Sequence, residues 1–93
     1  MHSDNRIHKN IRITGKVQGV GFRYHAMHAA SNIGVTGFVR NLSGGAVYIE
    51  AEGSLSSIEA FIAWCRQGPP RARVDHLDIT EGMVAGYQKF LVK

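Results

Sequence analysis

A glycine-rich stretch near the beginning of the chain constrains its fold most strongly, because it joins a strand-like pattern to a helical one. The stretch reads Gly15-Lys16-Val17-Gln18-Gly19-Val20-Gly21-Phe22-Arg23. Glycine allows positive φ angles, which turn successive main-chain N–H groups to one side, and the first turn of a helix adds partial positive charge. Arg23 would lie in that turn and present a planar set of donors that matches phosphate oxygens. The stretch therefore predicts an anion site between the first strand and the first helix.

Two common nucleotide-binding motifs do not fit this stretch. The P-loop pattern GxxxxGK needs a lysine directly after its second glycine, and no lysine follows Gly19 or Gly21. The dinucleotide fingerprint GxGxxG would need a third glycine where Tyr24 stands. A plain strand-to-helix turn, in which the glycines only relieve backbone strain, remains open as an alternative from this stretch alone.

The charges of the chain are unevenly distributed. The net charge is +4, and all seven acidic residues lie outside residues 5–49. That span carries Arg6, Lys9, Arg12, Lys16, Arg23 and Arg40. An acid-free half of this kind favours an anionic ligand through its local field and through steering. For Arg6, Lys9 and Arg12, the alternative is a solvated strand face without a partner.

Hydrophobic periodicity predicts two helices among five strands. The strands are expected at residues 7–14, 35–42, 46–52, 74–80 and 87–92. The first helix is expected over residues 22–33, with Gly34 as its stop. No Ser, Thr, Asp or Asn precedes Phe22 to cap this helix, so a bound anion could supply the acceptor that its first N–H groups lack.

The second helix is expected to begin at a capping box formed by Ser56 and Glu59 and to end at Gly68. Its predicted buried stripe consists of Leu55, Ile58, Ile62 and Cys65, with Phe61 and Trp64 flanking it. Cys65 is the only cysteine and is expected in the core, so neither an intramolecular disulfide nor a multi-cysteine metal site can form. His25 and His28 lack a third ligand at a recognisable spacing, and we expect them at the surface.

The order of these elements predicts an α+β fold of the ferredoxin-like type. A split βαβ pair (βαββαβ) with a short fifth strand forms an antiparallel sheet that carries both helices on one face. Right-handed crossovers then place the first and second strands on either side of the third. The glycine-rich loop and the turn after Asn41 would lie at the same end of the sheet, so that Arg23 and Asn41 can meet. An asparagine at such a position can also serve only its own turn.

The length of 93 residues predicts a single domain over residues 1–93, since no Pro, Gly or Ser tract divides the chain, and residues 1–6 are expected to be flexible. The beginning of the chain has no apolar run of the signal-peptide type. No stretch approaches the roughly 20 apolar residues of a membrane span. We therefore expect a cytoplasmic protein.

Two motifs, in this order and spacing, resemble the signatures of the acylphosphatase family. Residues 15–23 are similar to the first signature, and Gly37-Phe38-Val39-Arg40-Asn41, continuing through Gly45, Val47 and Gly53, is similar to the second. The likeness extends through Phe61, Trp64 and residues 70–74, so it covers nearly all of the chain after residue 7. It implies hydrolysis of the carboxyl-phosphate bond of an acyl phosphate to a carboxylate and inorganic phosphate.

The resemblance also implies roles for individual residues. Arg23 and main-chain N–H groups of the first motif would bind the phosphoryl group, and the Asn41 side chain would position the attacking water. These N–H groups belong to Gln18, Gly19, Val20, Gly21, Phe22 and Arg23. We expect a small-molecule acyl phosphate as substrate, no metal ion or cofactor, no nucleic-acid or membrane partner, and a monomer.

The residue types of the two motifs suit this chemistry. An acyl phosphate leaves as a carboxylate, whose conjugate acid has a pKa of about 4, so no general acid is needed. The phosphoryl oxygens carry most of the transition-state charge, which pre-formed main-chain donors and one arginine can stabilise. A carboxylate base beside a dianionic phosphate would be costly, whereas a neutral asparagine can hold water without repulsion. The substrate's own phosphate is our hypothesis for the group that accepts the proton of the water.

Two other functions fit parts of the sequence. The same fold and loop occur as a domain of larger proteins that handle carbamoyl phosphate, so one alternative is a binding or regulatory module that does not hydrolyse its ligand. The other alternative is an RNA-binding domain, because such domains share this order of elements and present aromatic residues on their central strands. Here the first strand has no aromatic residue, and the third has only Tyr48.

Overall fold

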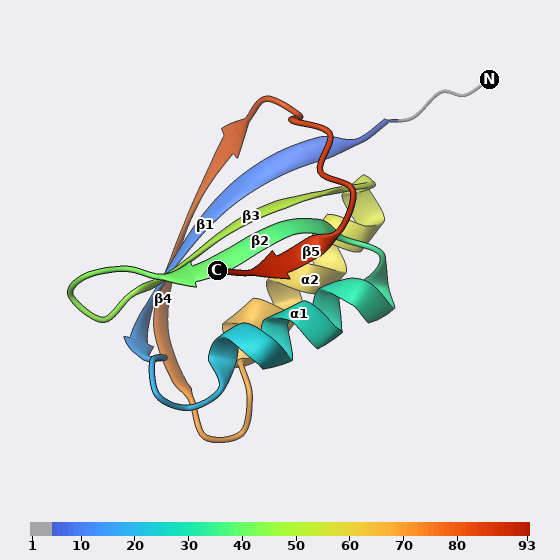
Figure 1. The fold of residues 1–93 in the computed structure, drawn as a ribbon. Coiled ribbons are helices and arrows are strands. Elements are labelled where there is room, and N and C mark those ends of the chain that lie inside the picture. The colour runs from blue at the N-terminus through green and yellow to red at the C-terminus, as the bar shows by residue number, and fades with distance from the viewer. Residues whose placement is uncertain (1–4) are drawn as a thin grey trace.

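The structure, a computed structural model, describes residues 5–93, which form two helices and five strands (Figure 1). The part of the chain expected to be flexible lies mostly outside the described residues, which begin at Asn5. The elements in chain order are β1 (Ile7–Lys16), α1 (Phe22–Ile33), β2 (Thr36–Asn41), β3 (Val47–Gly53), α2 (Leu55–Gln67), β4 (Arg73–Gly82) and β5 (Phe90–Val92). Neither helix of this part of the chain has the length and apolarity needed to cross a membrane.

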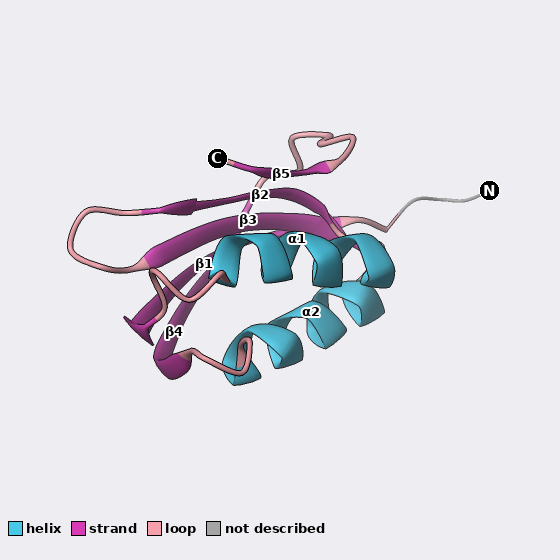
Figure 2. Ribbon diagram, turned by 60° about the horizontal axis from the view of Figure 1, so that its bottom comes forward, coloured by secondary structure: helices cyan, strands magenta, loops and turns pink. Residues whose placement is uncertain are grey.

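The sheet has the strand order β4-β1-β3-β2-β5, and both helices lie on one of its faces (Figure 2). The first four strands pair antiparallel with their neighbours, as predicted for a ferredoxin-like fold. The short β5 adds to β2 in the parallel direction, which makes the complete sheet mixed. Because β3 is antiparallel to both β1 and β2, these two strands run in the same direction and end at the same edge of the molecule, as the sequence predicted.

The core lies between the sheet and the two helices. Ile11 and Ile13 of β1 and Ile49 of β3 face the helices and are fully buried. Phe22 and Ala26 of α1 pack against this surface. Burial of apolar area on this scale is the dominant favourable term in folding, and the alternation of strand residues directs it to one face of the sheet.

Two predictions for α2 were wrong in detail. The N-cap is Ser54, two residues before the expected cap at Ser56, because Ser54 has extended backbone angles and its Oγ accepts a hydrogen bond from the N–H of Ser57. Phe61 is fully buried, whereas Leu55 is 58% exposed. The buried stripe is therefore Ile58, Phe61 and Cys65, because the spacing of three and four residues keeps these side chains on one helical face.

The prediction for Cys65 is confirmed, since the residue is fully buried in the core. Burial raises the pKa of its thiol well above the usual range, so the reactive thiolate form is disfavoured. His25 and His28 are exposed, as expected. Among residues 5–93, no three His, Cys, Asp or Glu side chains lie where they could hold a metal ion.

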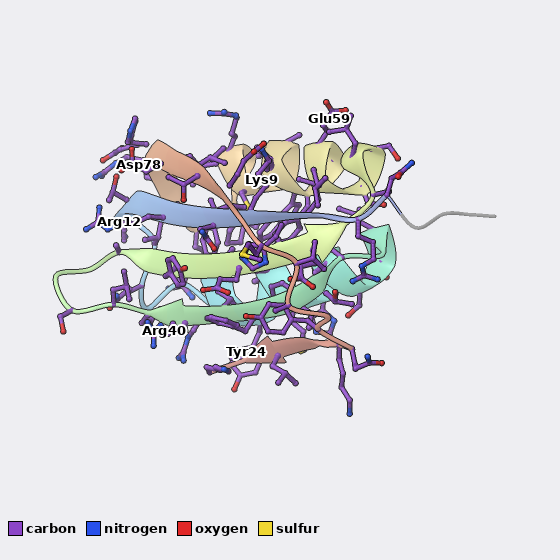
Figure 3. All side chains as sticks on the ribbon, turned by 90° about the horizontal axis from the view of Figure 1, so that it is seen from above. Lys9, Arg12, Tyr24, Arg40, Glu59 and Asp78 are labelled. Carbon is purple, nitrogen blue, oxygen red and sulfur yellow. The ribbon has the colours of Figure 1, made fainter. Side chains whose placement is uncertain are left out.

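The face of the sheet opposite the helices carries a buried carboxylate that the sequence did not reveal. The connection between β4 and β5 crosses over this face (Figure 3), and Glu52 lies beneath it with no exposed surface. Its carboxylate accepts hydrogen bonds from the N–H groups of Ala85, Gly86 and Tyr87. Glu52 thereby attaches the connection to β3 and fixes the path by which the chain reaches β5.

His8 pairs with the same carboxylate. Its Nδ1 lies 2.7 Å from Oε2 of Glu52, and its Nε2 lies 2.8 Å from Oδ1 of Asn10. Burial alone would lower the pKa of His8, but these hydrogen bonds and the charges of Glu50 and Glu52 raise it overall. Burial likewise favours the neutral form of Glu52, but its hydrogen bonds from Ala85, His8 and the following N–H groups lower the pKa overall. The pair therefore favours a charged His8 and a charged Glu52.

The raised pKa of His8 predicts a stability that depends on pH. Native His8 keeps its proton at a pH where unfolded His8, with a pKa of about 6.5, has lost it. The stabilisation is complete below about pH 6.5 and disappears as the pH rises through the native pKa. Urea unfolding at about pH 6 and about pH 9 should show a loss of unfolding free energy in the wild type that is absent from His8→Gln.

His76 offers a matched control, because it lies on the same sheet face with a carboxylate partner, Asp78, but both side chains are exposed. His76→Gln should keep the pH dependence of the wild type, since exposed pairs contribute little. Parallel pH profiles for the wild type and His8→Gln would contradict the role given to the buried pair.

Candidate active site

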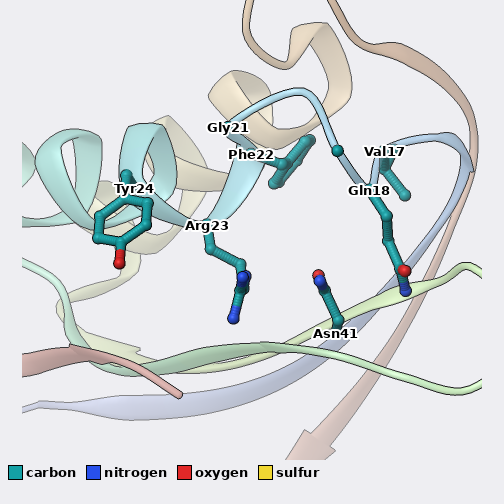
Figure 4. Close-up of a pocket in the computed structure, with 8 residues that line it drawn as sticks. Val17, Gln18, Gly21, Phe22, Arg23, Tyr24 and Asn41 are labelled. Carbon is teal, nitrogen blue, oxygen red and sulfur yellow. The ribbon is translucent and has the colours of Figure 1, made fainter.

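A small cavity of about 120 Å³ opens where β1 and β2 end and α1 begins (Figure 4). Its walls come from the loop after β1, the first turn of α1 and the last residue of β2. The lining residues are Val17, Gln18, Gly19, Gly21, Phe22, Arg23, Tyr24 and Asn41. The cavity thus brings together the two motifs that the sequence pointed to, which are separated along the chain but join at one end of the sheet.

The three glycines of the first motif serve two different purposes. Gly19 and Gly21 have φ angles of 75° and 76°, in the left-handed region that other residues adopt only with strain. Gly15 instead lies at an irregularity in the pairing of β1 with β4, where a Cβ would come within 2.1 Å of the carbonyl oxygen of Arg73. Gly19 and Gly21 therefore shape the loop, whereas Gly15 allows two strands to approach closely.

The loop presents a row of main-chain donors. Within residues 5–93, the N–H groups of residues 18–23 donate to no main-chain or side-chain acceptor. Helix α1 has Gly21 as its N-cap, no side-chain cap and no acidic residue in its first turn. Unpaired N–H groups at a helix N-terminus form a recess suited to an anion. This arrangement goes beyond what a plain strand-to-helix turn requires.

Arg23 and Asn41 point into the same space from opposite walls (Figure 4). A hydrogen bond fixes the orientation of the Arg23 guanidinium: its Nη1 donates to the main-chain oxygen of Lys93 at 2.8 Å. Lys93 itself is fixed to the sheet by a 2.8 Å hydrogen bond from its N–H to the carbonyl of Val39. Lys93 therefore orients the Arg23 guanidinium, whose other N–H groups remain available to a ligand.

The Asn41 side chain does not stabilise the turn that follows it. Across the described residues its carboxamide forms no hydrogen bond, and the turn is closed instead by the N–H of Leu42 donating to the carbonyl of Ala46 at 2.8 Å. The side chain is exposed to the cavity and carries both a donor and an acceptor. It can therefore hold a water molecule or a ligand oxygen without giving up an internal bond.

The Gln18 side chain has a role that the sequence did not indicate. Its Nε2 donates to the carbonyl oxygens of Leu42 and Ala46, each at 2.8 Å. These carbonyls belong to the turn between β2 and β3, directly after Asn41. Gln18 therefore links the glycine-rich loop to the hairpin, which holds the two halves of the cavity at a fixed separation.

The remaining residues considered from sequence lie outside the cavity lining. The side chain of Val20 is buried in the core, so only its main chain belongs to the loop. Arg6 donates to Thr36, and Lys9 forms an ion pair with Glu81 at 2.9 Å. The guanidinium of Arg40 lies over the ring of Tyr48 on the other face of the sheet. Three cations of the acid-free half thus have partners outside the cavity, and of the cations within residues 5–49 Arg23 is the one that lines it.

Comparison with known proteins identifies the family of this chain. The model of the acylphosphatase family matches residues 9–92. The chain belongs to the acylphosphatase family. An acylphosphatase of Methylococcus capsulatus is 49% identical over 81 residues, which cover 87% of this chain and 86% of that protein.

Solved acylphosphatase structures share the fold closely. An acylphosphatase from Coxiella burnetii superposes with a TM-score of 0.95 at 36% identity, covering all of both chains. The full-length HypF protein, solved in a phosphate- and nucleotide-bound form, contains a similar region, with a TM-score of 0.91 at 35% identity. That match covers 99% of this chain but only 12% of HypF, so the acylphosphatase fold also occurs inside a much longer protein.

The link made by Gln18 predicts a measurable loss on its removal. Gln18→Ala removes two hydrogen bonds to carbonyl oxygens of the turn, each of which keeps one main-chain donor, so the loss should be roughly 1–3 kcal/mol of unfolding free energy. It should also weaken the binding of inorganic phosphate, because the loop loses its attachment to the hairpin. Urea unfolding and phosphate titration calorimetry measure the two effects. Gln88→Ala, which removes only an exposed 3.4 Å contact, is the control, and equal stability of the two variants would contradict the prediction.

Proposed function

We propose that this chain hydrolyses acyl phosphates to a carboxylate and inorganic phosphate, without a metal ion or cofactor. The observation that carries the proposal is the single cavity in which unpaired main-chain N–H groups, the Arg23 guanidinium and the Asn41 carboxamide face one another. Membership of the acylphosphatase family supports the same reaction.

In the proposed mechanism, the phosphoryl group enters the recess at the beginning of α1. The N–H groups of Gln18, Gly19, Val20, Gly21, Phe22 and Arg23 and the Arg23 side chain bind its oxygens. Because Gly19 and Gly21 and the hydrogen bond from Arg23 to Lys93 fix these donors in advance, little reorganisation accompanies the reaction. Such pre-formed donors stabilise the charge that the phosphoryl oxygens carry in the transition state.

Asn41 would orient the attacking water. As the bond from the water oxygen to phosphorus forms, the bond from phosphorus to the acyl oxygen breaks and the carboxylate leaves with its electron pair. A carboxylate is a good leaving group at neutral pH, so no general acid is needed, and no acidic side chain lines the cavity among the described residues. A phosphoryl oxygen takes the proton of the water in this scheme.

We further propose that the protein acts as a cytoplasmic monomer on a small molecule rather than on nucleic acid. Every group that the proposed mechanism uses, namely the loop N–H groups, Arg23 and Asn41, comes from this chain, so the reaction needs no residue of a partner. The sheet face opposite the helices is poorly suited to stacking bases, because Phe38 is only 9% exposed and the Tyr48 hydroxyl donates to Glu50 at 2.7 Å. A carboxylate in the middle of that face would also repel a nucleic-acid backbone.

The second candidate function is a binding module without hydrolysis. The similarity of this chain to one region of HypF, which was solved in a phosphate- and nucleotide-bound form, supports this candidate. Incubation with acetyl phosphate or benzoyl phosphate in the presence of a chelator distinguishes an enzyme from a binding module. Repeated turnover with release of inorganic phosphate supports the enzyme. Stoichiometric binding of the acyl phosphate without release would overturn the proposal.

Replacement of Arg23 should reduce both binding and turnover. Arg23→Ala removes a cationic donor from the phosphoryl site, which typically costs on the order of 100- to 1000-fold in rate. The affinity for inorganic phosphate should fall as well, measured as its inhibition constant. Arg12→Ala removes an exposed arginine on the other face of the sheet and should leave both values as in the wild type. Unchanged phosphate affinity in Arg23→Ala would contradict the assigned role.

Replacement of Asn41 should separate binding from turnover. Asn41→Ala removes the group that orients the water but none of the phosphoryl donors, so kcat should fall by roughly 100-fold or more while phosphate inhibition stays nearly constant. Steady-state kinetics with benzoyl phosphate and competition by inorganic phosphate measure the two parameters. Wild-type hydrolysis by Asn41→Ala would exclude this residue from the mechanism.

A further inference from the structure

One aromatic side chain at the rim of the cavity has no structural task. Tyr24 is 59% exposed although it is large and largely apolar, and it lines the cavity next to Arg23. In the described part of the molecule, neither its ring nor its hydroxyl has a hydrogen-bond or aromatic partner. The other large exposed apolar residues, Leu55, Met83, Val84 and Leu91, are absent from the cavity lining.

The rest of the cavity offers little apolar surface to a ligand. Val17 and Phe22 contribute to its wall, but they are 1% and 2% exposed and belong to the core. The remaining lining residues present main-chain groups, a guanidinium or carboxamides. An apolar part of a ligand that extends out of the phosphoryl recess can therefore meet an exposed apolar partner at Tyr24.

The geometry of phosphoryl transfer indicates the direction in which that part extends. The attacking and leaving oxygens lie roughly in line on opposite sides of phosphorus. If Asn41 holds the water, the acyl group leaves on the side away from Asn41. Figure 4 shows Arg23 between Asn41 and Tyr24, so this side is the one on which the Tyr24 ring lies.

From this arrangement we propose that Tyr24 is the residue that selects the acyl group, and that the site favours acyl phosphates with an aromatic or bulky apolar acyl group over acetyl phosphate. The inference rests on the proposed hydrolysis. The ring of Tyr24 packs against the acyl group, while Arg23 and the loop hold the phosphoryl group. Tyr24 is thus a specificity-determining residue that takes no part in bond breaking.

The ratio of kcat/KM for benzoyl phosphate to that for acetyl phosphate tests the proposal. The wild type should prefer benzoyl phosphate, and Tyr24→Ala should lower the ratio roughly 3- to 10-fold, which corresponds to the loss of one aromatic pair. The change should reside mainly in KM for benzoyl phosphate, because binding of the acyl group is lost. Tyr24→Phe should keep the wild-type ratio, since the ring and not the hydroxyl makes the contact.

Leu55→Ala is the matched control, because it removes a large apolar side chain of similar exposure from α2, outside the cavity. It should keep the wild-type ratio. A second readout does not depend on turnover: Tyr24→Ala should raise the inhibition constant of phenylphosphonate relative to that of methylphosphonate.

Each other outcome overturns the inference in a recognisable way. An unchanged ratio in Tyr24→Ala, or an equal loss on both substrates, would show that Tyr24 does not contact the acyl group, while the proposed hydrolysis would stand. A loss in Tyr24→Phe as large as in Tyr24→Ala would assign the effect to the hydroxyl. Failure of the wild type to hydrolyse either substrate would overturn the proposed function itself.

Discussion

The pairing of β3 with both β1 and β2 is the constraint on which the rest of the structure depends. Val47 of β3 is the register partner of Ile13 on one side and of Asn41 on the other. Neighbouring strands lie about 4.8 Å apart, so Asn41 comes level with Ile13 of β1 at a distance of two strands. A slip of one residue would turn Asn41 to the opposite face of the sheet, away from α1. The cavity therefore depends on the register of β3 with β1 and β2 as well as on the contacts within the cavity.

The two faces of the sheet use polar groups in different ways. On the face opposite the helices, Glu52 and His8 are buried and hydrogen-bonded to each other. Glu52 also accepts hydrogen bonds from the connection to β5 and so stabilises its path. At the cavity, the N–H groups of the loop and the Asn41 carboxamide have no partner within residues 5–93. Polar groups of a small domain are normally paired when buried, so donors left open toward a cavity can serve a ligand at little structural cost.

The cavity is also distinguished by its electrostatics. It lies at the N-terminus of α1, where the helix dipole favours negative charge, and it contains one guanidinium and no carboxylate among the described residues. Within residues 5–93 the acidic residues lie on β3, β4 and α2 instead, where Glu81 pairs with Lys9 and Asp75 pairs with Arg73. An anion meets little repulsion at the cavity, and the fixed donors need not reorganise around it.

The local features of this protein can be recognised in its sequence. The alternation of apolar residues predicts the strands, the closely spaced glycines predict the loop, and the missing cap before Phe22 predicts open donors at the first helix. These features depend on neighbouring residues, so they can be recognised without knowledge of the fold. The two motifs also pointed to Arg23 and Asn41, which lie together at the cavity.

The tertiary structure brings together other distant residues whose contacts no local pattern indicates. Gln18 looks like one residue of a loop, but its side chain joins two carbonyls of a hairpin 24 and 28 residues further on. Glu52 looks like a solvent-facing residue of an alternating strand, but it is covered by the connection after β4, whose N–H groups 33 and 34 residues further on donate to its carboxylate. Tyr24 follows Arg23 in a helix, and its place on the rim depends on how that helix packs on the sheet. The order of the elements predicts the strand order, but it does not identify these individual contacts, because each depends on segments that come together only when the whole sheet forms.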